Sequence, residues 1–135
     1  MTLKQIMLPD SNRSTTLLGN AGEHAVGQWL QQQGYRIHCY NYRTRGGEID
    51  LIAQREEIIS FIEVKVRTTH YFNSSQLITK EKQRKIIQTA RIFCMRYGLS
   101  DVVVRFDVAL LQPTDTDFEI TYIPNAFTDT TRNCI

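Results

Sequence analysis

Two acidic residues and a lysine lie in two neighbouring segments that read as strands. Asp50 belongs to Glu48–Gln54, and Glu63 and Lys65 belong to Ile58–Arg67, which is rich in Ile, Val and Phe. If the two segments form an antiparallel hairpin, Asp50 faces Glu63, and Lys65 points to the same side as Glu63. Opposed side chains lie about 4.5–5.5 Å apart at Cβ, so two carboxylates there repel each other unless a cation lies between them. Hard divalent cations such as Mg²⁺ take oxygen ligands of this kind. The spacing therefore predicts a metal site with a lysine beside it for a phosphate.

The alternative for these residues is an ordinary soluble surface, because exposed strands often carry Glu and Lys. Ile59 and Phe61 precede Glu63 and Lys65 on one face of the segment, and the residues of its other face are apolar as well. A strand of this kind is buried on both sides, where an unpaired charge is costly. The pattern therefore favours a functional site over a solvated face.

Glu23 is a third carboxylate with two roles open to it. It can close a capping box with Asn20 at the start of a helix. Alternatively, Glu23, Val26 and Leu30 follow helical spacing, which places Glu23 near the inward stripe. An inward carboxylate on this helix could reach the strand pair, and spacing alone does not choose between the two roles.

Basic residues gather where a polyanion could meet this site. Residues 80–96 hold six basic residues against one acid, and residues 107–129 hold five acids with no basic residue. Lys82 and Lys85 form a basic face that is either an ordinary solvated surface or, beside a metal site, a surface for phosphates. Three arginines flank the strand pair on loops or strand ends and extend this surface: Arg43, Arg45 and Arg67.

The remaining pattern predicts the order α-β-β-β-α-β-β in one α/β domain. Turn and capping residues mark the ends of these elements: Asn20, Gly34, Thr79 and Gly98 at the helices, and Pro113 between the last two strands. The predicted elements are helices over Ala21–Gln33 and Lys80–Tyr97, strands over Tyr35–Asn41, Glu48–Gln54, Ile58–Arg67, Val102–Leu111 and Phe118–Ile123, and a loop from Thr68 to about Ile78.

Length and composition agree with one globular domain. The chain has 135 residues with 41% hydrophobic and 22% charged residues, which excludes a disordered chain, a collagen-like repeat and a coiled coil. We expect a flexible arm over 1–18, the domain over 19–124 and a tail over 125–135. Three scattered cysteines without CxxC spacing argue against disulfides and structural zinc. The absence of long apolar runs predicts no membrane span and no signal peptide, and hence a cytoplasmic protein.

Taken in order, these segments resemble the YraN family of small uncharacterised bacterial proteins. That family is placed in the restriction-endonuclease-like, or PD-(D/E)xK, nuclease superfamily and is similar to archaeal Holliday junction resolvases. The matching segments, which run from about Gly19 to Ile123, are Gly22-Glu23, Gly34-Tyr35, Asn41-Tyr42-Arg43, Gly47-Glu48-Ile49-Asp50-Leu51-Ile52, Phe61-Ile62-Glu63-Val64-Lys65 with Arg67, Lys82-Gln83 and Arg105-Phe106-Asp107-Val108.

The resemblance implies an α/β restriction-endonuclease-like α-β-β-β-α-β core, with a central mixed sheet flanked by helices. It also implies a Mg²⁺- or Mn²⁺-dependent endonuclease acting on DNA, in particular on branched or recombining DNA. The implied catalytic residues are Glu23, Asp50, Glu63 and Lys65. The metal ligands would be Asp50, Glu63 and the carbonyl of Val64, completed by Glu23 directly or through water. By analogy with junction resolvases, a homodimer is also expected.

Two other classes of function remain open. One is a non-catalytic nucleic-acid-binding module on the same fold, although the presence of all four polar positions argues against it. The other is an interaction protein whose basic helix docks an acidic partner. A steep salt dependence of DNA affinity would argue against the second alternative.

Overall fold

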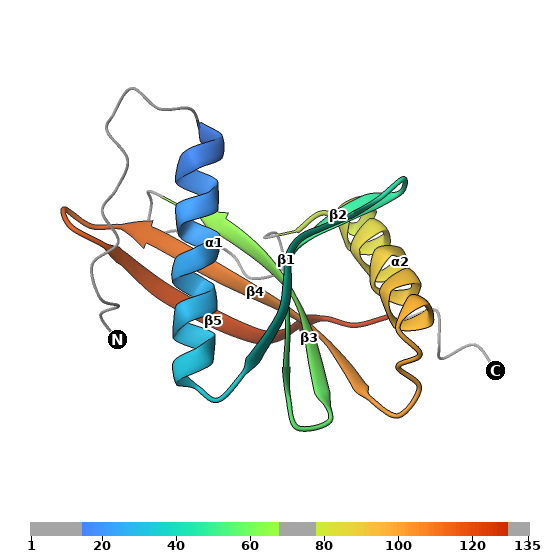
Figure 1. The fold of residues 1–135 in the computed structure, drawn as a ribbon. Helices are drawn as coiled ribbons and strands as arrows, with labels where there is room; N and C mark the ends of the chain where they lie inside the picture. Colours follow the sequence, from blue (N-terminus) through green and yellow to red (C-terminus); the bar gives the residue numbers. More distant parts are fainter. Residues whose placement is uncertain (1–14, 68–77, 130–135) are drawn as a thin grey trace.

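Five strands form one sheet between two helices in the computed structural model, which describes residues 15–67 and 78–129 (Figure 1). The strands lie side by side in chain order, β1-β2-β3-β4-β5. Only β3 and β4 are parallel, and α2 makes the crossover between them. The elements are α1 (Thr15–Gln32), β1 (Arg36–Thr44), β2 (Gly47–Arg55), β3 (Ile58–Val66), α2 (Lys80–Arg96), β4 (Val103–Pro113) and β5 (Phe118–Phe127). The predicted mixed sheet flanked by helices is confirmed.

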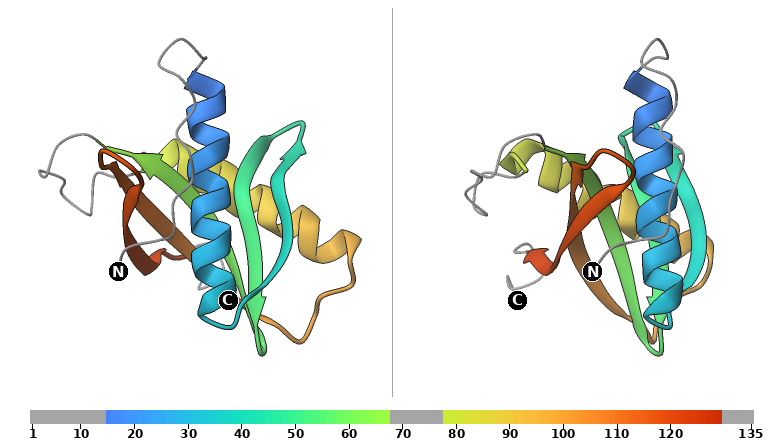
Figure 2. Two further views of the ribbon diagram at one scale, coloured as in Figure 1. Left: turned by 60° about the vertical axis from the view of Figure 1, so that its left-hand side comes forward. Right: turned by 90° about the vertical axis from the view of Figure 1, so that its left-hand side faces the viewer.

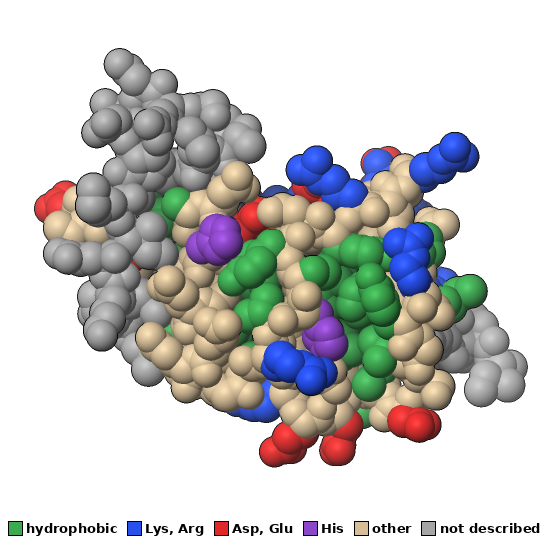
Figure 3. Space-filling model, in the orientation of Figure 1, with side chains coloured by type: hydrophobic (Ala, Val, Ile, Leu, Met, Phe, Trp, Pro, Cys, Tyr) green, Lys and Arg blue, Asp and Glu red, His purple; other side chains and the backbone are tan. Residues whose placement is uncertain are grey.

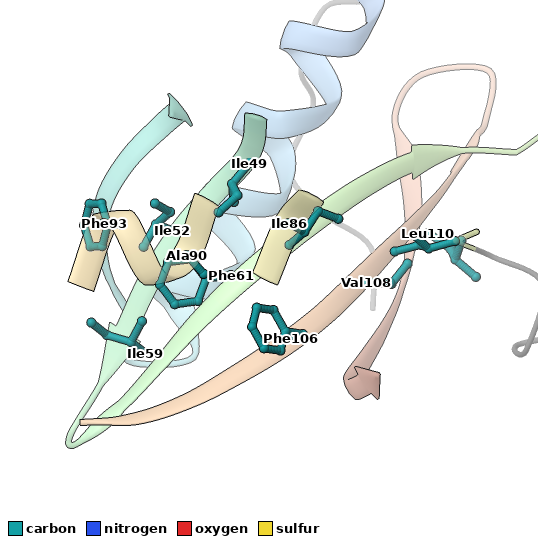
Figure 4. Close-up of a cluster of buried hydrophobic side chains, with 11 residues drawn as sticks. Ile49, Ile52, Ile59, Phe61, Ile86, Ala90, Phe93, Phe106, Val108 and Leu110 are labelled. Carbon is teal, nitrogen blue, oxygen red and sulfur yellow. The ribbon is translucent and has the colours of Figure 1, made fainter. Parts of the chain in front are cut away.

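The two helices cover opposite faces of the sheet, so β2, β3 and β4 are buried on both sides (Figure 2). The core between α2 and the sheet contains Ile49, Ile52, Ile59, Phe61, Ile86, Ala90, Phe93, Phe106, Val108 and Leu110 (Figure 4). The core on the α1 side contains Ala25, Val26, Leu30, Tyr35, Leu51, Ala53, Ile62, Ala109, Leu111 and Phe118. Burial on this scale drives folding, at roughly 25 cal/mol for each Å² of apolar surface removed from water.

The predicted ends of α2 and the predicted C-terminal end of α1 are confirmed by local geometry. Thr79 caps α2, since its side-chain oxygen accepts a hydrogen bond from the Lys82 N–H at 3.2 Å. Gly34 and Gly98 follow the two helices with φ of 90° and 63°, in the left-handed region that glycine adopts without strain.

The start of α1 differs from the prediction. The helix begins at Thr15 rather than Ala21, so it includes the last residues of the segment predicted as an arm. Asn20 therefore lies inside the helix and cannot be its N-cap. The capping-box role of Glu23 is wrong for this reason, and the inward role remains.

The end of β5 also differs from the prediction. The strand continues to Phe127 instead of ending at Ile123, so the predicted tail contributes to the sheet. Pro124 is tolerated because β5 is an edge strand, where a missing N–H breaks no ladder. Asn125 adopts a φ of 53° and donates its N–H to the Asp107 carboxylate at 2.8 Å, where the register shifts.

The predicted loop from Thr68 lies almost entirely outside the described residues, as do 1–14 and 130–135. Neither helix in the described ranges is long and apolar enough to cross a membrane.

Candidate active site

The candidate site lies where β2 and β3 separate. Their antiparallel ladder has the predicted register and runs from Arg55↔Ile58 to Leu51↔Ile62. It stops one residue before the predicted Asp50–Glu63 pair. Instead of continuing the ladder, the Asp50 carboxylate accepts the N–H of Val64 at 2.9 Å. This bond anchors Asp50 to β3, so two acidic side chains are held at the point where the strands diverge.

Asp50 and Glu63 form a buried acidic pair. The two residues are 9% and 6% exposed, and the charge of Glu63 acts on the Asp50 carboxyl group. Burial, followed by repulsion from Glu63, raises the pKa of Asp50 to about 7. Asp50 therefore keeps its proton up to near neutral pH unless a cation replaces it.

Two lysines face the Glu63 carboxylate. Lys82 reaches from the first turn of α2 to form an ion pair and hydrogen bond with Glu63 Oε1. Lys65 Nζ lies 4.0 Å from the same oxygen. Burial and then the charge of Lys82 lower the pKa of Lys65. Burial acts to lower the pKa of Lys82 as well, but the bond to Glu63 outweighs it and raises the pKa.

Glu23 approaches the pair from α1 and is held by Asn41. The Asn41 amide donates to Glu23 Oε2 at 2.9 Å, and Glu23 is 9% exposed. Burial raises the pKa of Glu23. The negative charge of Glu23 in turn helps to raise the pKa of Asp50. Gly27, one turn after Glu23, allows this approach, because a Cβ there would collide with the Tyr40 hydroxyl on β1.

Asn41 is a site residue that the sequence argument did not identify. It adopts a φ of 53°, a left-handed conformation that asparagine tolerates better than most residues. The register of β1 and β2 places it opposite Asp50. The one signal in the sequence that could have indicated Asn41 is its polar side chain between aromatic residues in a segment that otherwise resembles a strand.

Loss of the Asn41 amide is expected to weaken divalent metal binding about 10–100-fold, the usual effect of removing a residue that orients a ligand. Asn41→Gly keeps the left-handed backbone but leaves Glu23 without its donor. Isothermal titration calorimetry with Mn²⁺ measures the effect. Asn125→Gly is the matched control, because Asn125 has the same φ of 53° far along the chain in β5. Equal Mn²⁺ affinity in the two variants would contradict a positioning role for Asn41.

The donor set suits a hard divalent cation, although no three His, Cys, Asp or Glu side chains within residues 15–67 and 78–129 lie close enough together to hold a metal as arranged. Mg²⁺ is usually bound by one or two carboxylates and keeps several waters. Asp50 and Glu63 meet that requirement, and two buried carboxylates side by side need a positive partner. Val64 lies beside them with its N–H committed to Asp50, which leaves its carbonyl as the predicted ligand.

Metal affinity should depend on pH through Asp50, because a protonated carboxyl must lose its proton to bind a cation. We expect the Mn²⁺ association constant to fall up to about tenfold for each pH unit below about 7 and to level off above it. Calorimetric titrations between pH 5.5 and 8.5 test this. An affinity independent of pH over that range would show that Asp50 is not a ligand.

The other predicted basic residues surround the site without entering it. Arg43 is exposed and pairs with Glu48 at 3.1 Å, and Lys85 is exposed and pairs with Glu81 at 3.7 Å. Arg45 is exposed in the β1–β2 turn. Lys and Arg side chains gather over this turn in the space-filling view (Figure 3).

Arg67 follows β3 and is partly buried. Its backbone N–H bonds the Leu111 carbonyl at 2.7 Å. Its guanidinium donates to the Val66 carbonyl at 3.2 Å. Arg67 is therefore held against the end of β3, at the edge of the candidate site.

The family model and the relatives described next all point to one family. The model of the uncharacterised protein family UPF0102, the YraN family, matches residues 22–111. A UPF0102 protein of Desulfosudis oleivorans is 44% identical over 110 residues, which cover 81% of this chain and 88% of that protein. A second, of Vibrio parahaemolyticus, is 39% identical over 114 residues, which cover 83% and 93%. A third, of Treponema pallidum, is 37% identical over 127 residues, which cover 90% and 98%.

Proposed function

This chain belongs to the uncharacterised protein family UPF0102, and we propose that it is a metal-dependent nuclease that hydrolyses phosphodiester bonds in DNA. One observation carries the proposal. Asp50 and Glu63 are buried together where two strands separate, with Asp50 holding a pKa of about 7 and Lys65 beside the pair. Strongly perturbed carboxyls in one place are typical of functional sites.

In this proposal Asp50 and Glu63 would hold Mg²⁺ or Mn²⁺, with the Val64 carbonyl and Glu23 completing the ligand set. A divalent ion lowers the pKa of a bound water and neutralises charge that develops on a phosphate. Lys65 would place its ammonium against that phosphate and stabilise the charge of the transition state. Asn41 would keep Glu23 turned toward the pair.

The nucleic acid would lie across the basic rim. Arg43, Arg45 and Lys85 are exposed around the site and suit contacts to phosphates, which fix position without reading sequence. Arg67 would contact the backbone at the end of β3. The substrate we propose is branched or recombining DNA, following the resemblance to junction resolvases.

Cleavage assays on a panel of substrates test the proposal. The panel contains a four-way DNA junction, a flap, duplex DNA, single-stranded DNA and RNA, each with Mg²⁺ and with Mn²⁺. We expect DNA cleavage that Asp50→Asn and Lys65→Ala each abolish while DNA affinity changes little. Glu48→Gln is the matched control, because Glu48 is exposed beside the site. Folded wild-type protein that cuts no substrate with either metal would refute catalysis.

A non-catalytic nucleic-acid-binding module is the second candidate. The Lys82–Glu63 ion pair favours it. In a protein that binds no metal, Lys82 would neutralise Glu63 permanently, and no cation would be needed there. Such a module would bind DNA with a steep salt dependence, and its DNA affinity would not respond to Mn²⁺.

We also propose a homodimer, by analogy with junction resolvases. Sedimentation equilibrium is then expected to give about twice the chain mass of 15.7 kDa. A monomer at micromolar concentration would contradict this part of the proposal.

A further inference from the structure

Lys82 occupies an unusual position for a residue of a basic helix face. Its ammonium is bonded to Glu63, whose side chain is 6% exposed, while the Lys82 side chain is itself 44% exposed. The lysine backbone is held by the Thr79 cap at the start of α2, so only the long side chain has freedom to move. Lys82 therefore neutralises the acidic pair from its solvent side and retains an open path to solvent.

The other basic residues of this helix are placed differently. Lys85 lies one turn further along α2, is 58% exposed and pairs with Glu81 on its own helix. Lys65 approaches Glu63 no closer than 4.0 Å and comes from the neighbouring position on the same strand face. Among the described lysines, Lys82 alone joins the acidic pair to the basic surface.

A cation bound by Glu63 would compete with the Lys82 ammonium for this carboxylate. A divalent ion on this carboxylate would lie next to the ammonium, and two positive charges at such a distance repel strongly in a partly buried site. The ammonium must then leave Glu63, and because the Lys82 side chain is 44% exposed it can turn to solvent, where a phosphate would lie. Lys82 would exchange a carboxylate for a phosphate.

We propose that Lys82 is a positioning residue that couples the two ligands of the site. It holds Glu63 while no divalent ion is present and turns to a substrate phosphate when the ion binds. Lys82 thereby weakens ion binding in the absence of DNA and makes ion and DNA bind cooperatively, each strengthening the other by the same factor. This inference rests on the proposed function, because it requires the acidic pair to bind a divalent ion.

The first test is Mn²⁺ affinity without DNA, measured by calorimetry on the full chain. Lys82→Met removes the competing charge and keeps a side chain of similar length, so we expect Mn²⁺ to bind about tenfold more tightly. Lys85→Met makes the same change of charge on the same helix and should leave Mn²⁺ affinity unchanged. Lys82→Arg keeps the charge and should retain the wild-type affinity.

The second test is DNA affinity with and without Ca²⁺, measured by fluorescence anisotropy with a labelled four-way junction. Wild-type protein and Lys82→Arg should gain about tenfold in affinity from Ca²⁺, and Lys82→Met should lose this gain. Lys85→Met should weaken DNA binding by the same factor in both conditions.

Two results overturn the inference and can be told apart. If wild-type protein binds Mn²⁺ but Lys82→Met binds it no more tightly, the coupling role fails and the proposed nuclease stands. If wild-type protein binds no Mn²⁺, both fail together.

Discussion

Replacing Asp50 with asparagine is expected to lower the cleavage rate at least about 10³-fold, which abolishes detectable cleavage. The same change is expected to stabilise the metal-free protein. The loss of activity follows because asparagine is a weak ligand for a hard cation, and the pair then holds only one negative charge. The gain in stability follows because the neutral amide no longer places a buried charge beside Glu63. The amide still offers an oxygen to the Val64 N–H, so the anchor to β3 is kept.

The stability change has a defined pH dependence. The pKa of Asp50 is raised from 3.8 to about 7 in the folded protein, so between these values the native state binds more protons than the unfolded state. Wild-type stability therefore falls as pH rises through this window. Asp50→Asn removes the loss, and we expect about 1–3 kcal/mol of extra stability at pH 8, shrinking toward zero near pH 4.

Urea unfolding at pH 4, 6 and 8 without metal measures this effect. Glu48→Gln is again the matched control and should change stability by less than about 0.5 kcal/mol, because Glu48 is exposed. An Asp50→Asn protein that is less stable than wild type at pH 8 would mean that Asp50 is a structural residue.

Asp107→Ala is expected to destabilise the protein by about 3–5 kcal/mol, the usual result of breaking a buried ion pair. Asp107 is fully buried and accepts hydrogen bonds from the Arg105 guanidinium at 2.9–3.1 Å, from the Tyr122 hydroxyl and from the Asn125 N–H. Arg105 also donates to the Tyr35 hydroxyl at 2.7 Å. Removing the carboxylate leaves a partly buried guanidinium and a tyrosine without their main partner.

Urea unfolding at pH 7 tests this second prediction. Asp107→Asn should lose less stability than Asp107→Ala, because its amide oxygen can still accept one or two of the bonds. A loss below about 1 kcal/mol for Asp107→Ala would show that the network contributes little. Arg105 and Asp107 are two residues apart on β4 and so lie on the same face of the strand, where they form an ion pair.

The Asp50–Glu63 pair could be predicted from the sequence because the side chains of a strand alternate strictly between its two faces. Once β2 and β3 pair as a hairpin, alternation alone brings Asp50 opposite Glu63, and the observed register agrees. The role of Glu23 depended on where α1 begins. Leu17 and Leu18 continue the helical apolar spacing before Ala21, and this signal competed with the good capping residue Asn20.

The contacts of Asn41 and Lys82 could not be predicted because they depend on packing between distant elements. A left-handed residue inside a strand leaves no mark in an alternating pattern, and Asn41 meets Glu23 only after α1 packs on β1. A run of basic residues indicates a solvated helix face, and nothing local shows that Lys82 turns inward to Glu63. β5 continues past Pro124 for a similar reason, since Asn125 is anchored by Asp107 on another strand.

The most direct measurement is the anomalous scattering of manganese in crystals of the wild-type protein grown with saturating Mn²⁺. We predict a manganese peak with carboxylate oxygens of Asp50 and Glu63 both within about 2.0–2.6 Å, and with the Lys82 ammonium moved off Glu63. A map without manganese between these two carboxylates, with Lys82 still bonded to Glu63, would contradict it.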